Sequence, residues 1–410
     1  MVSVTKHNTP ALRFGEYSQP WVEMKNNRIF VPTDERGFAG LPVLSATQKD
    51  GFIPRSMLGK EISYNKDAEK TYKRVLPDDF AIHLRSFQGG FAHSKYEGIT
   101  SPAYTTFRLR QASQHDGLFW KYFFTSPLFI QSLTKVTYGI RDGRSIGADE
   151  YFLEDSCFPP LPEEQRAIGE LFSNLDVLIE QHRAKHANLQ QTKTALLQRM
   201  FPRDGSDEPE LRLDGFSGAW KTKPLKDLGS PYGGLTGKTK SDFGHGNAHY
   251  ITYLDVFEHA LITDMSRLGT IEIDARQNEV NTGDALFTVS SEVADEVGMS
   301  AVWLGKGRNI YLNSFCFGFR PTVALDSNFF AYVLRSPEFR KKMGLLAQGI
   351  SRFNISKLKA MELDISIPAI EEQRAIGEVF SNLDALIAAE SRYITQLTQA
   401  KTALLQRMFV

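Results

Sequence analysis

Residues 163–201 read EEQRAIGELFSNLDVLIEQHRAKHANLQQTKTALLQRMF, and residues 371–409 read EEQRAIGEVFSNLDALIAAESRYITQLTQAKTALLQRMF. The two segments lie 208 residues apart and are identical at 26 of 39 aligned positions, which chance cannot produce. The chain is therefore an internal duplication, and its repeat unit consists of one variable stretch followed by one of these segments.

Each repeated segment is predicted to form one long helix of a coiled coil. Proline followed by acidic residues marks the start of each helix, and the apolar residues then recur every seven positions. The two seam positions hold Ile168, Leu175, Leu189, Leu196, Phe172, Ile179 and Met200 in the first copy, and Ile376, Leu383, Leu397, Leu404, Phe380, Ile387, Ile394 and Met408 in the second. A helix of 38 residues is about 57 Å long, which is too long to pack on one domain alone.

We expect the two helices to pair antiparallel, because a twofold axis is the simplest relation between duplicated halves. The copies do not match from Glu180 to Asn188, and full overlap would place His182 near Glu390 as a polar pair that sets the register. Gly169 and Gly377 occupy equivalent helical positions, which indicates either the close approach of another helix or simple tolerance of glycine.

The stretches outside the helices show only short echoes of each other, and residues 22–120 and 221–330 have no obvious similarity. Both variable stretches are predicted to be α/β domains. The expected strands are Phe80–Phe87, Pro102–Leu109, His249–Val256, Asp284–Val289, Met299–Leu304 and Tyr311–Phe319. A helical hairpin closes each domain, with Leu118–Thr125 and Phe329–Arg335 each stopping at Ser-Pro.

The composition is that of an ordinary globular protein of two or three domains, with 410 residues, 41% hydrophobic and 23% charged. Lys+Arg and Asp+Glu both number 48, which argues against a simple polybasic nucleic-acid binder. No signal peptide and no apolar run of about 18 residues is visible, so we expect a cytoplasmic protein without a membrane segment. Cys157 and Cys316 are far apart and predict neither a disulfide framework nor a zinc module.

Motifs that carry catalytic chemistry are not evident, so we expect a non-catalytic protein without a cofactor or metal of its own. Gly233–Thr239 reads GGLTGKT, which is one residue short of a P-loop. His182 and His186 have the helical spacing of a metal pair, but a third ligand is not obvious, which favours an ordinary helix surface.

The repeated anchors resemble those of the specificity subunit of type I restriction–modification enzymes. PPLPEEQR at 159–166 and PAIEEQR at 368–374 are similar to the family's helix start, and LLQRMF is similar to its helix end. LRSFQGG at 84–90 with GITSPAY at 98–104 resembles one version of the target recognition domain, and GDALFT at 283–288 with GGLT at 233–236 resembles another.

The resemblance implies an α/β protein with two target recognition domains separated by two long helices that pair as an antiparallel coiled coil with pseudo-twofold symmetry. The domains would be residues 1–158 and 202–367, and the conserved helices residues 159–201 and 368–410. Each domain would read one half of a bipartite, asymmetric site in double-stranded DNA. The helices would set the spacer and bind two methyltransferase subunits, and restriction subunits would complete the complex. S-adenosylmethionine, ATP and Mg²⁺ would be bound by those partner subunits.

Candidate DNA contacts follow from side-chain chemistry, because Arg, Asn and Gln suit base edges whereas Lys, Ser and Thr suit phosphates. They are Arg85, Gln88, His93, Lys95, Arg141 and Arg144 in the first domain, and Thr236, Lys238, Lys240, Ser290, Arg352, Asn354 and Lys357 in the second. The alternative is a coiled-coil adaptor that binds two protein partners and no DNA. A self-sufficient methyltransferase or nuclease would need a cofactor or metal motif.

Overall fold

The structure is a computed structural model that describes residues 8–47, 50–58, 66–83, 90–138 and 145–410. The chain forms two compact units. The first unit contains residues 1–183 together with 392–410, and the second contains residues 184–391. Each unit therefore combines one variable α/β stretch with one half of each long helix.

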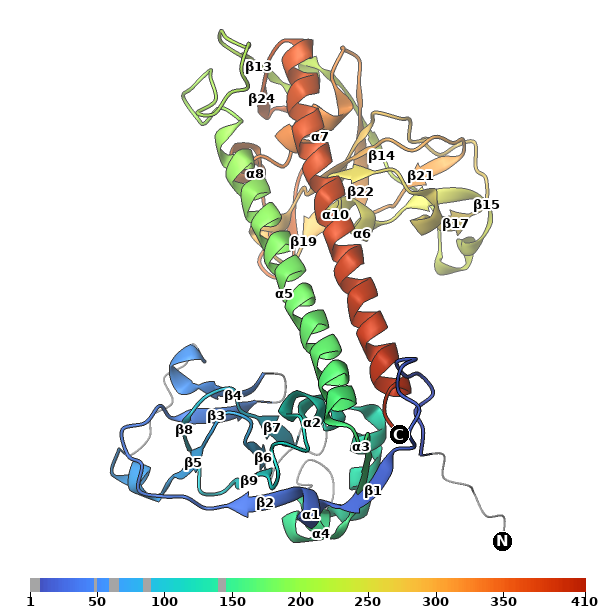
Figure 1. The fold of residues 1–410 in the computed structure, drawn as a ribbon. Helices are drawn as coiled ribbons and strands as arrows, with labels where there is room; N and C mark the ends of the chain where they lie inside the picture. The colour runs from blue at the N-terminus through green and yellow to red at the C-terminus, as the bar shows by residue number, and fades with distance from the viewer. Residues whose placement is uncertain (1–7, 48–49, 59–65, 84–89, 139–144) are drawn as a thin grey trace. The chain divides into compact units, whose positions relative to one another are not determined.

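An antiparallel four-stranded sheet of order β2-β9-β6-β7 forms the centre of the first unit (Figure 1). Short two-stranded ladders, β3–β4, β5–β8, β10–β11 and β1–β12, surround it. The strands are β1 (Val22–Lys25), β2 (Phe30–Thr33), β3 (Leu44–Thr47), β4 (Gly51–Pro54), β5 (Lys73–Val75), β6 (Phe80–Ile82), β7 (Phe91–His93), β8 (Gly98–Thr100), β9 (Thr105–Leu109), β10 (Thr137–Tyr138), β11 (Ser145–Ile146) and β12 (Asp155–Phe158).

An aromatic core packs the helices of the first unit against this sheet. Trp120 and Phe124 on the helical hairpin contact Phe30 of the sheet, with ring centroids 4.9 and 5.8 Å apart. The side chain of Ser126 caps α3, as the Ser-Pro pattern predicted, and the side chain of Asp116 caps α2. The helices are α1 (Asn26–Ile29), α2 (Gly117–Phe123), α3 (Pro127–Ser132) and α4 (Ala148–Leu153).

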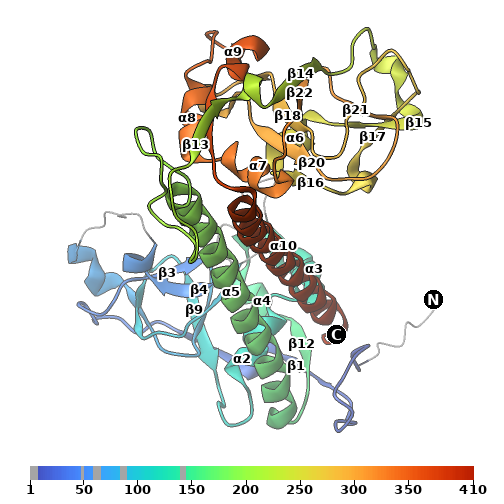
Figure 2. The same cartoon turned by 90° about the horizontal axis from the view of Figure 1, so that it is seen from above.

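The second unit contains a five-stranded sheet of order β14-β22-β18-β20-β16 and a three-stranded sheet of order β17-β15-β21. Figure 2 shows α8 and α9 at one end of this unit, the larger sheet in the middle and the smaller sheet at the other end. The strands are β13 (Lys221–Pro224), β14 (Gly229–Gly233), β15 (Phe243–Ile251), β16 (Leu261–Ile262), β17 (Gly269–Ile271), β18 (Ala285–Thr288), β19 (Ser290–Ser291), β20 (Ser300–Trp303), β21 (Ile310–Leu312), β22 (Cys316–Pro321), β23 (Phe353–Asn354) and β24 (Asp364–Ile367).

Two strand predictions are corrected in this unit. The expected strand His249–Val256 ends at Ile251, because Thr252 and Asp255 form a capping box that starts α6 (Tyr253–Glu258). The expected strand Tyr311–Phe319 is two strands, β21 and β22, joined by a turn at Asn313. The helical hairpin is confirmed as α7 (Ser327–Val333) and α8 (Pro337–Gly344), and α9 (Lys357–Met361) follows it.

The two sheets share one scaffold although their sequences differ. The order β2-β9-β6-β7 in the first unit corresponds to β14-β22-β18-β20 in the second. A buried aspartate precedes the central strand of each sheet and accepts two hydrogen bonds from an arginine on the neighbouring strand. Arg108 donates to Asp79 at 3.0 Å in the first unit, and Arg320 donates to Asp284 at 2.8 and 3.0 Å in the second. Different loops are therefore carried by equivalent frameworks.

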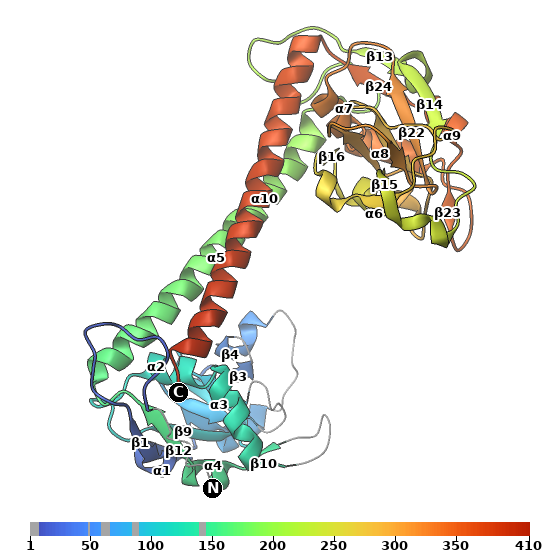
Figure 3. The ribbon, with the colours of Figure 1, turned by 90° about the vertical axis from the view of Figure 1, so that its right-hand side faces the viewer.

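The repeated segments form the helices α5 (Pro162–Arg199) and α10 (Ile370–Arg407), each of 38 residues. They lie side by side in Figures 1 and 3. Asp176 of α5 pairs with Lys401 of α10 in the first unit, and Lys193 of α5 pairs with Asp384 of α10 in the second. The later residue of α5 thus pairs with the earlier residue of α10, so the helices are antiparallel, as predicted.

The helix pair becomes polar at its divergent middle. In the first unit the ring of His182 lies 4.5 Å from that of Tyr393. In the second unit Lys185 forms an ion pair with Glu390, a buried carboxylate on α10. A polar middle was predicted from the mismatch of the two copies. The expected pairing of His182 with Glu390 stays a prediction.

Replacing Gly377 by alanine is expected to destabilise the second unit. Alanine normally stabilises a helix by about 1 kcal/mol relative to glycine. At Gly377, however, a Cβ atom would lie 2.7 Å from the backbone nitrogen of Phe329 and 2.6 Å from the carboxylate of Asp326. We expect overpacking to cost about 1–3 kcal/mol in urea unfolding. Ala388→Gly, at an exposed position of the same helix, is the control that measures the difference in helix propensity between alanine and glycine. A Gly377→Ala protein more stable than the wild type would contradict the close approach at Gly377.

Candidate nucleic-acid interface

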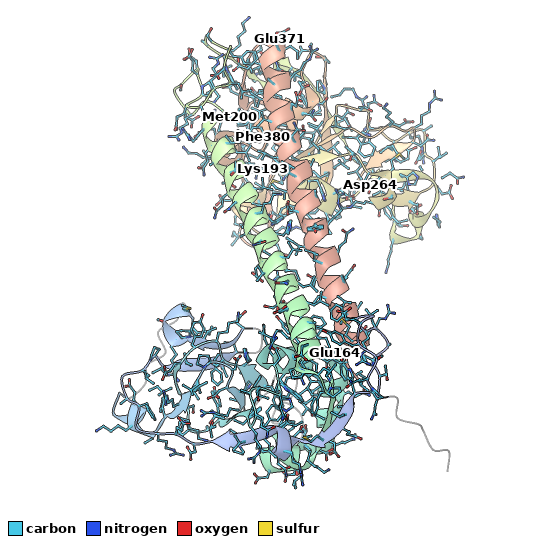
Figure 4. The ribbon with its side chains drawn as sticks, in the orientation of Figure 1. Glu164, Lys193, Met200, Asp264, Glu371 and Phe380 are labelled. Carbon is cyan, nitrogen blue, oxygen red and sulfur yellow. The ribbon has the colours of Figure 1, made fainter. Side chains whose placement is uncertain are left out.

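Repeated residues at the start of each long helix hold the adjoining α/β domain. The buried Glu164 carboxylate accepts hydrogen bonds from Arg13 at 2.6 and 2.7 Å, and Figure 4 shows Glu164 at the start of α5. Glu372 accepts the equivalent pair from Arg212 at 2.9 and 2.8 Å. Each buried glutamate is therefore neutralised by an arginine of its own unit, and the same Arg–Glu contact occurs in both halves of the duplication.

The glutamine that follows this glutamate, and a glycine about one turn further along, continue the attachment on each helix. The Gln165 side chain accepts from the backbone N–H of Asp116, and Gln373 accepts from that of Asp326, both at 3.0 Å. Gly169 and Gly377 lie against the first turns of α2 and α7, which confirms that another helix approaches them closely. Each α/β domain is thus attached to its own long helix by contacts that both halves of the duplication repeat.

The repeated helix ends are also buried within the units. Phe409 stacks on Phe172 in the first unit, and Phe201 stacks on Phe380 in the second, with ring centroids 5.7 Å apart in both. Figure 4 labels Met200, which directly follows α5, and Phe380 of α10 in the second unit. These residues serve the fold, so any partner must use other repeated positions.

Each unit has a second repeated contact, in which a tyrosine of the α/β domain meets an aspartate of one long helix and a lysine of the other. Tyr122 donates to Asp176 at 2.7 Å, and Tyr332 donates to Asp384 at 2.8 Å. Burial alone would raise the pKa of Asp176. Hydrogen bonds from Lys401 and Tyr122 outweigh this effect and hold that pKa below its ordinary value. Each domain is therefore tied to both long helices.

In the first unit, two of the six candidate DNA contacts can be placed. His93 is buried on β7, and its Nε2 lies 2.8 Å from the Asp78 carboxylate, so contact with a base would require this pair to break. Lys95 is exposed in the turn between β7 and β8. Arg85, Gln88, Arg141 and Arg144 lie outside the described residues.

In the second unit, one group of candidates surrounds the segment 274–278. The backbone N–H of Thr236 donates to Gln277 at 3.0 Å. Lys238 is largely buried and forms a 3.0 Å ion pair with Asp274, whereas Lys240 is exposed at the start of the following turn. Of these side chains, Thr236 and Lys240 are the ones open to a ligand.

A second group gathers where β19 pairs with β23. This ladder places Ser290 opposite Asn354, with Ser290 buried and Asn354 exposed. The exposed Arg352 lies beside them, and Lys357, half-buried, begins α9. The structure therefore brings Ser290 to Arg352 and Asn354, which lie about 60 residues further along the sequence.

Sequence reasoning missed Phe315, an aromatic side chain 56% exposed between β21 and β22. The Arg352 guanidinium lies 5.9 Å from its ring centroid, and the Phe315 carbonyl accepts from the N–H of Val289. On the other side of the same turn, Gly234 approaches the carbonyl of Asn313. The turn 313–315 thus links both groups of candidates. The mistaken continuous strand over Tyr311–Phe319 concealed it.

A cluster of metal-ligating side chains and a helix able to span a membrane are both absent from the described part of the chain. No cluster of three or more His, Cys, Asp or Glu side chains could hold a metal ion there. None of the helices described is long and apolar enough to span a membrane. The GGLTGKT segment has its lysine, Lys238, engaged by Asp274.

These features define a class of protein: an internal duplication in which two α/β domains of one topology carry different loops on a pair of antiparallel helices. Residues 218–399 match the model of the type I restriction modification DNA specificity domain. A curated relative, the putative type I restriction enzyme MjaX specificity subunit of Methanocaldococcus jannaschii, is 26% identical over 205 residues. These residues are 46% of this chain and 45% of the relative, so the chain spans about half the length of the curated relative it matches.

Three solved structures share the fold over nearly the whole chain. The S subunit of a type I restriction–modification system from M. genitalium has a TM-score of 0.57 at 14% identity and covers 98% of this chain and 99% of that one. A second structure, described as the structural basis of complex assembly and conformational transition of the type I R-M system, has a TM-score of 0.55 at 18% identity. The match covers 95% of this chain and 98% of that one. The HsdS subunit of Thermoanaerobacter tengcongensis has a TM-score of 0.51 at 17% identity, and the match covers 96% of this chain and 98% of that one. The resemblance to type I restriction–modification specificity subunits is confirmed.

Proposed function

We propose that the chain is the DNA sequence-specificity subunit of a type I restriction–modification complex. Residues 1–158 and 202–367 each read one half of a bipartite, asymmetric site. The observation that carries the proposal is that the two domains share one sheet order while their loops differ. A duplicated framework with two different reading surfaces suits an asymmetric site, because each surface meets a different half-site.

The proposed DNA contacts in the second domain centre on the surface around the turn 313–315. Arg352 and Asn354 carry the donors and acceptors that suit base edges, and the Arg352 guanidinium lies 5.9 Å from the Phe315 ring centroid. The exposed Thr236 and Lys240 would contact phosphates. In the first domain the proposal rests on Lys95 and on candidates outside the described residues, namely Arg85, Gln88, Arg141 and Arg144.

The conserved helices, residues 159–201 and 368–410, set the spacer and bind two methyltransferase subunits in this proposal. Nine positions are identical in both copies and exposed in both, and the four nearest the helix start follow one another along one helix stripe. These four are Glu163, Arg166, Glu170 and Asn174 in α5, and Glu371, Arg374, Glu378 and Asn382 in α10. The duplication therefore presents one exposed surface twice, which supports two copies of one partner.

Replacing Arg166 by glutamate is expected to reduce the bound methyltransferase subunits from two to one. Charge reversal at the centre of one stripe opposes the partner there and leaves the equivalent stripe around Arg374 intact. The Arg166→Glu/Arg374→Glu double variant is expected to bind none. Native mass spectrometry of the co-expressed proteins measures the stoichiometry. Gln181→Glu, exposed at an unmatched position of α5, is the control. Two bound subunits in the double variant would contradict docking on this stripe.

The function is tested by co-expressing the chain with a methyltransferase subunit of a type I restriction–modification system. We expect a complex that methylates DNA at one defined sequence when S-adenosylmethionine is supplied, and restriction subunits complete it for cleavage. The chain itself contributes recognition, and the partners bind S-adenosylmethionine, ATP and Mg²⁺. A complex that assembles without binding DNA would instead favour the adaptor, which the paired helices alone also support.

A further inference from the structure

Two lysines and one carboxylate meet in the first unit where the α/β domain contacts the helix pair, and the exposed Lys95 adds a positive charge that acts on Lys121. Lys401 of α10 forms an ion pair with Asp176 of α5. The Lys121 ammonium, on α2, lies 3.7 Å from the same carboxylate and donates to the Tyr122 hydroxyl at 3.0 Å. Both ammonium groups lie over the Tyr122 ring, 4.4 and 5.4 Å from its centroid. We call these residues, with Lys95, the lysine cluster.

The charges in the lysine cluster do not balance. Burial and the nearby positive charges of Lys95 and Lys401 lower the pKa of Lys121, and Asp176 only partly opposes this. Lys95 forms no salt bridge within the described part of the chain and is exposed. Lys121 and Lys401 thus share one carboxylate and Lys95 adds further positive charge, so keeping Lys121 charged costs stability unless an anion binds there.

The second unit shows the same contact in a balanced form. Lys193 and Tyr332 meet Asp384 there, one lysine for one carboxylate. Because Tyr122 corresponds to Tyr332, the position that corresponds to Lys121 is Ala331, a fully buried side chain. The tie between domain and helices therefore does not need a second lysine, and the additional cations of the first unit require another explanation.

We propose that Lys95, Lys121 and Lys401 bind a phosphate group of the DNA backbone at the first half-site. The proposal rests on the proposed DNA-reading function and adds an asymmetry to it. Ammonium groups bind phosphates as point charges with several donors, and such contacts are independent of the base sequence. The first domain thus has a contact with the DNA phosphate backbone that the second domain lacks. Lys121 is held for it by Tyr122 and Asp176.

The Lys95→Gln/Lys121→Met double variant tests the phosphate site in the complete complex with methyltransferase subunits. Loss of one phosphate contact is expected to make the slope of log Kobs against log salt shallower by about 0.9, and to weaken binding on the order of tenfold at moderate salt. The loss should be equal for the cognate duplex and an unrelated duplex, and the methylated sequence should not change. Lys121→Arg should retain the wild-type slope.

Two comparisons separate this site from a structural role. Lys121→Met alone should keep or raise the melting temperature, because it removes a half-buried cation between two others. Arg28→Gln removes one exposed charge from α1 of the same unit and should leave the slope unchanged. An unchanged slope in the double variant, or a lower melting temperature in Lys121→Met, would overturn the phosphate site alone. Failure of the wild-type complex to bind any DNA specifically would overturn the proposed function.

Discussion

Replacing residues 221–365 by the corresponding segment of a specificity subunit with another target is expected to change one half of the methylated sequence completely. The segment carries the five-stranded sheet, both groups of candidate DNA contacts and the turn 313–315. The first domain and both long helices stay as they are. The other half-site and the spacer length should therefore remain unchanged, because the helices hold the spacing.

The chimera requires the donor segment to fit the helices. Tyr332 must be kept because its hydroxyl donates to Asp384 of α10. Asp326 must be kept because its side chain caps α7 and so holds the backbone N–H that donates to Gln373. Restoring both residues in a donor that lacks them is the matched control for folding. The reciprocal replacement of residues 22–155 should change only the other half-site. A chimera that folds, methylates DNA and alters both halves would contradict independent reading by the two domains.

Replacing Arg335 by methionine is expected to destabilise the second unit more than any surface change. The Arg335 guanidinium donates to the carbonyl of Ser300 at 2.6 Å and to three further carbonyls between Val256 and His259 at 2.7 to 3.0 Å. Burial holds the pKa of Arg335 down to about 10, so it remains charged at neutral pH. Methionine fills similar space but leaves these carbonyls without their donor, at an expected cost of about 3–5 kcal/mol.

That loss is a large fraction of the stability of about 5–15 kcal/mol typical of a domain. Urea unfolding monitored by tryptophan fluorescence measures it, since Trp220 and Trp303 lie in the second unit. Arg276→Met is the control, because this side chain is 88% exposed and should change stability by less than about 0.5 kcal/mol. An Arg335→Met protein as stable as Arg276→Met would show that the four carbonyls do not depend on Arg335.

The helix pair was predictable because its information is local and repeated. Seven-residue spacing defines each seam, and the 208-residue offset relates the copies. The common scaffold of the two sheets was not predictable, since it depends on pairs such as Asp79 with Arg108 and Asp284 with Arg320. These pairs form across strands, and the residues around them differ.

The candidate site was predictable only where one loop supplied the chemistry. Lys95 and Arg352 were chosen from polar loops and are exposed in the structure. Ser290 and His93 were chosen for the same reason and are buried, because a strand pattern does not reveal which face a ladder covers. Lys121 was missed because its partners Asp176 and Lys401 come from two distant helices.

The central claim is that two different domains on equivalent frameworks read two halves of one site. Sequencing the methylated positions of a genome that carries the complete system tests this claim most directly. We expect a single asymmetric motif with two defined segments separated by a spacer of constant length and arbitrary sequence. A continuous motif, a palindrome with identical halves, or methylation without sequence preference would contradict the claim.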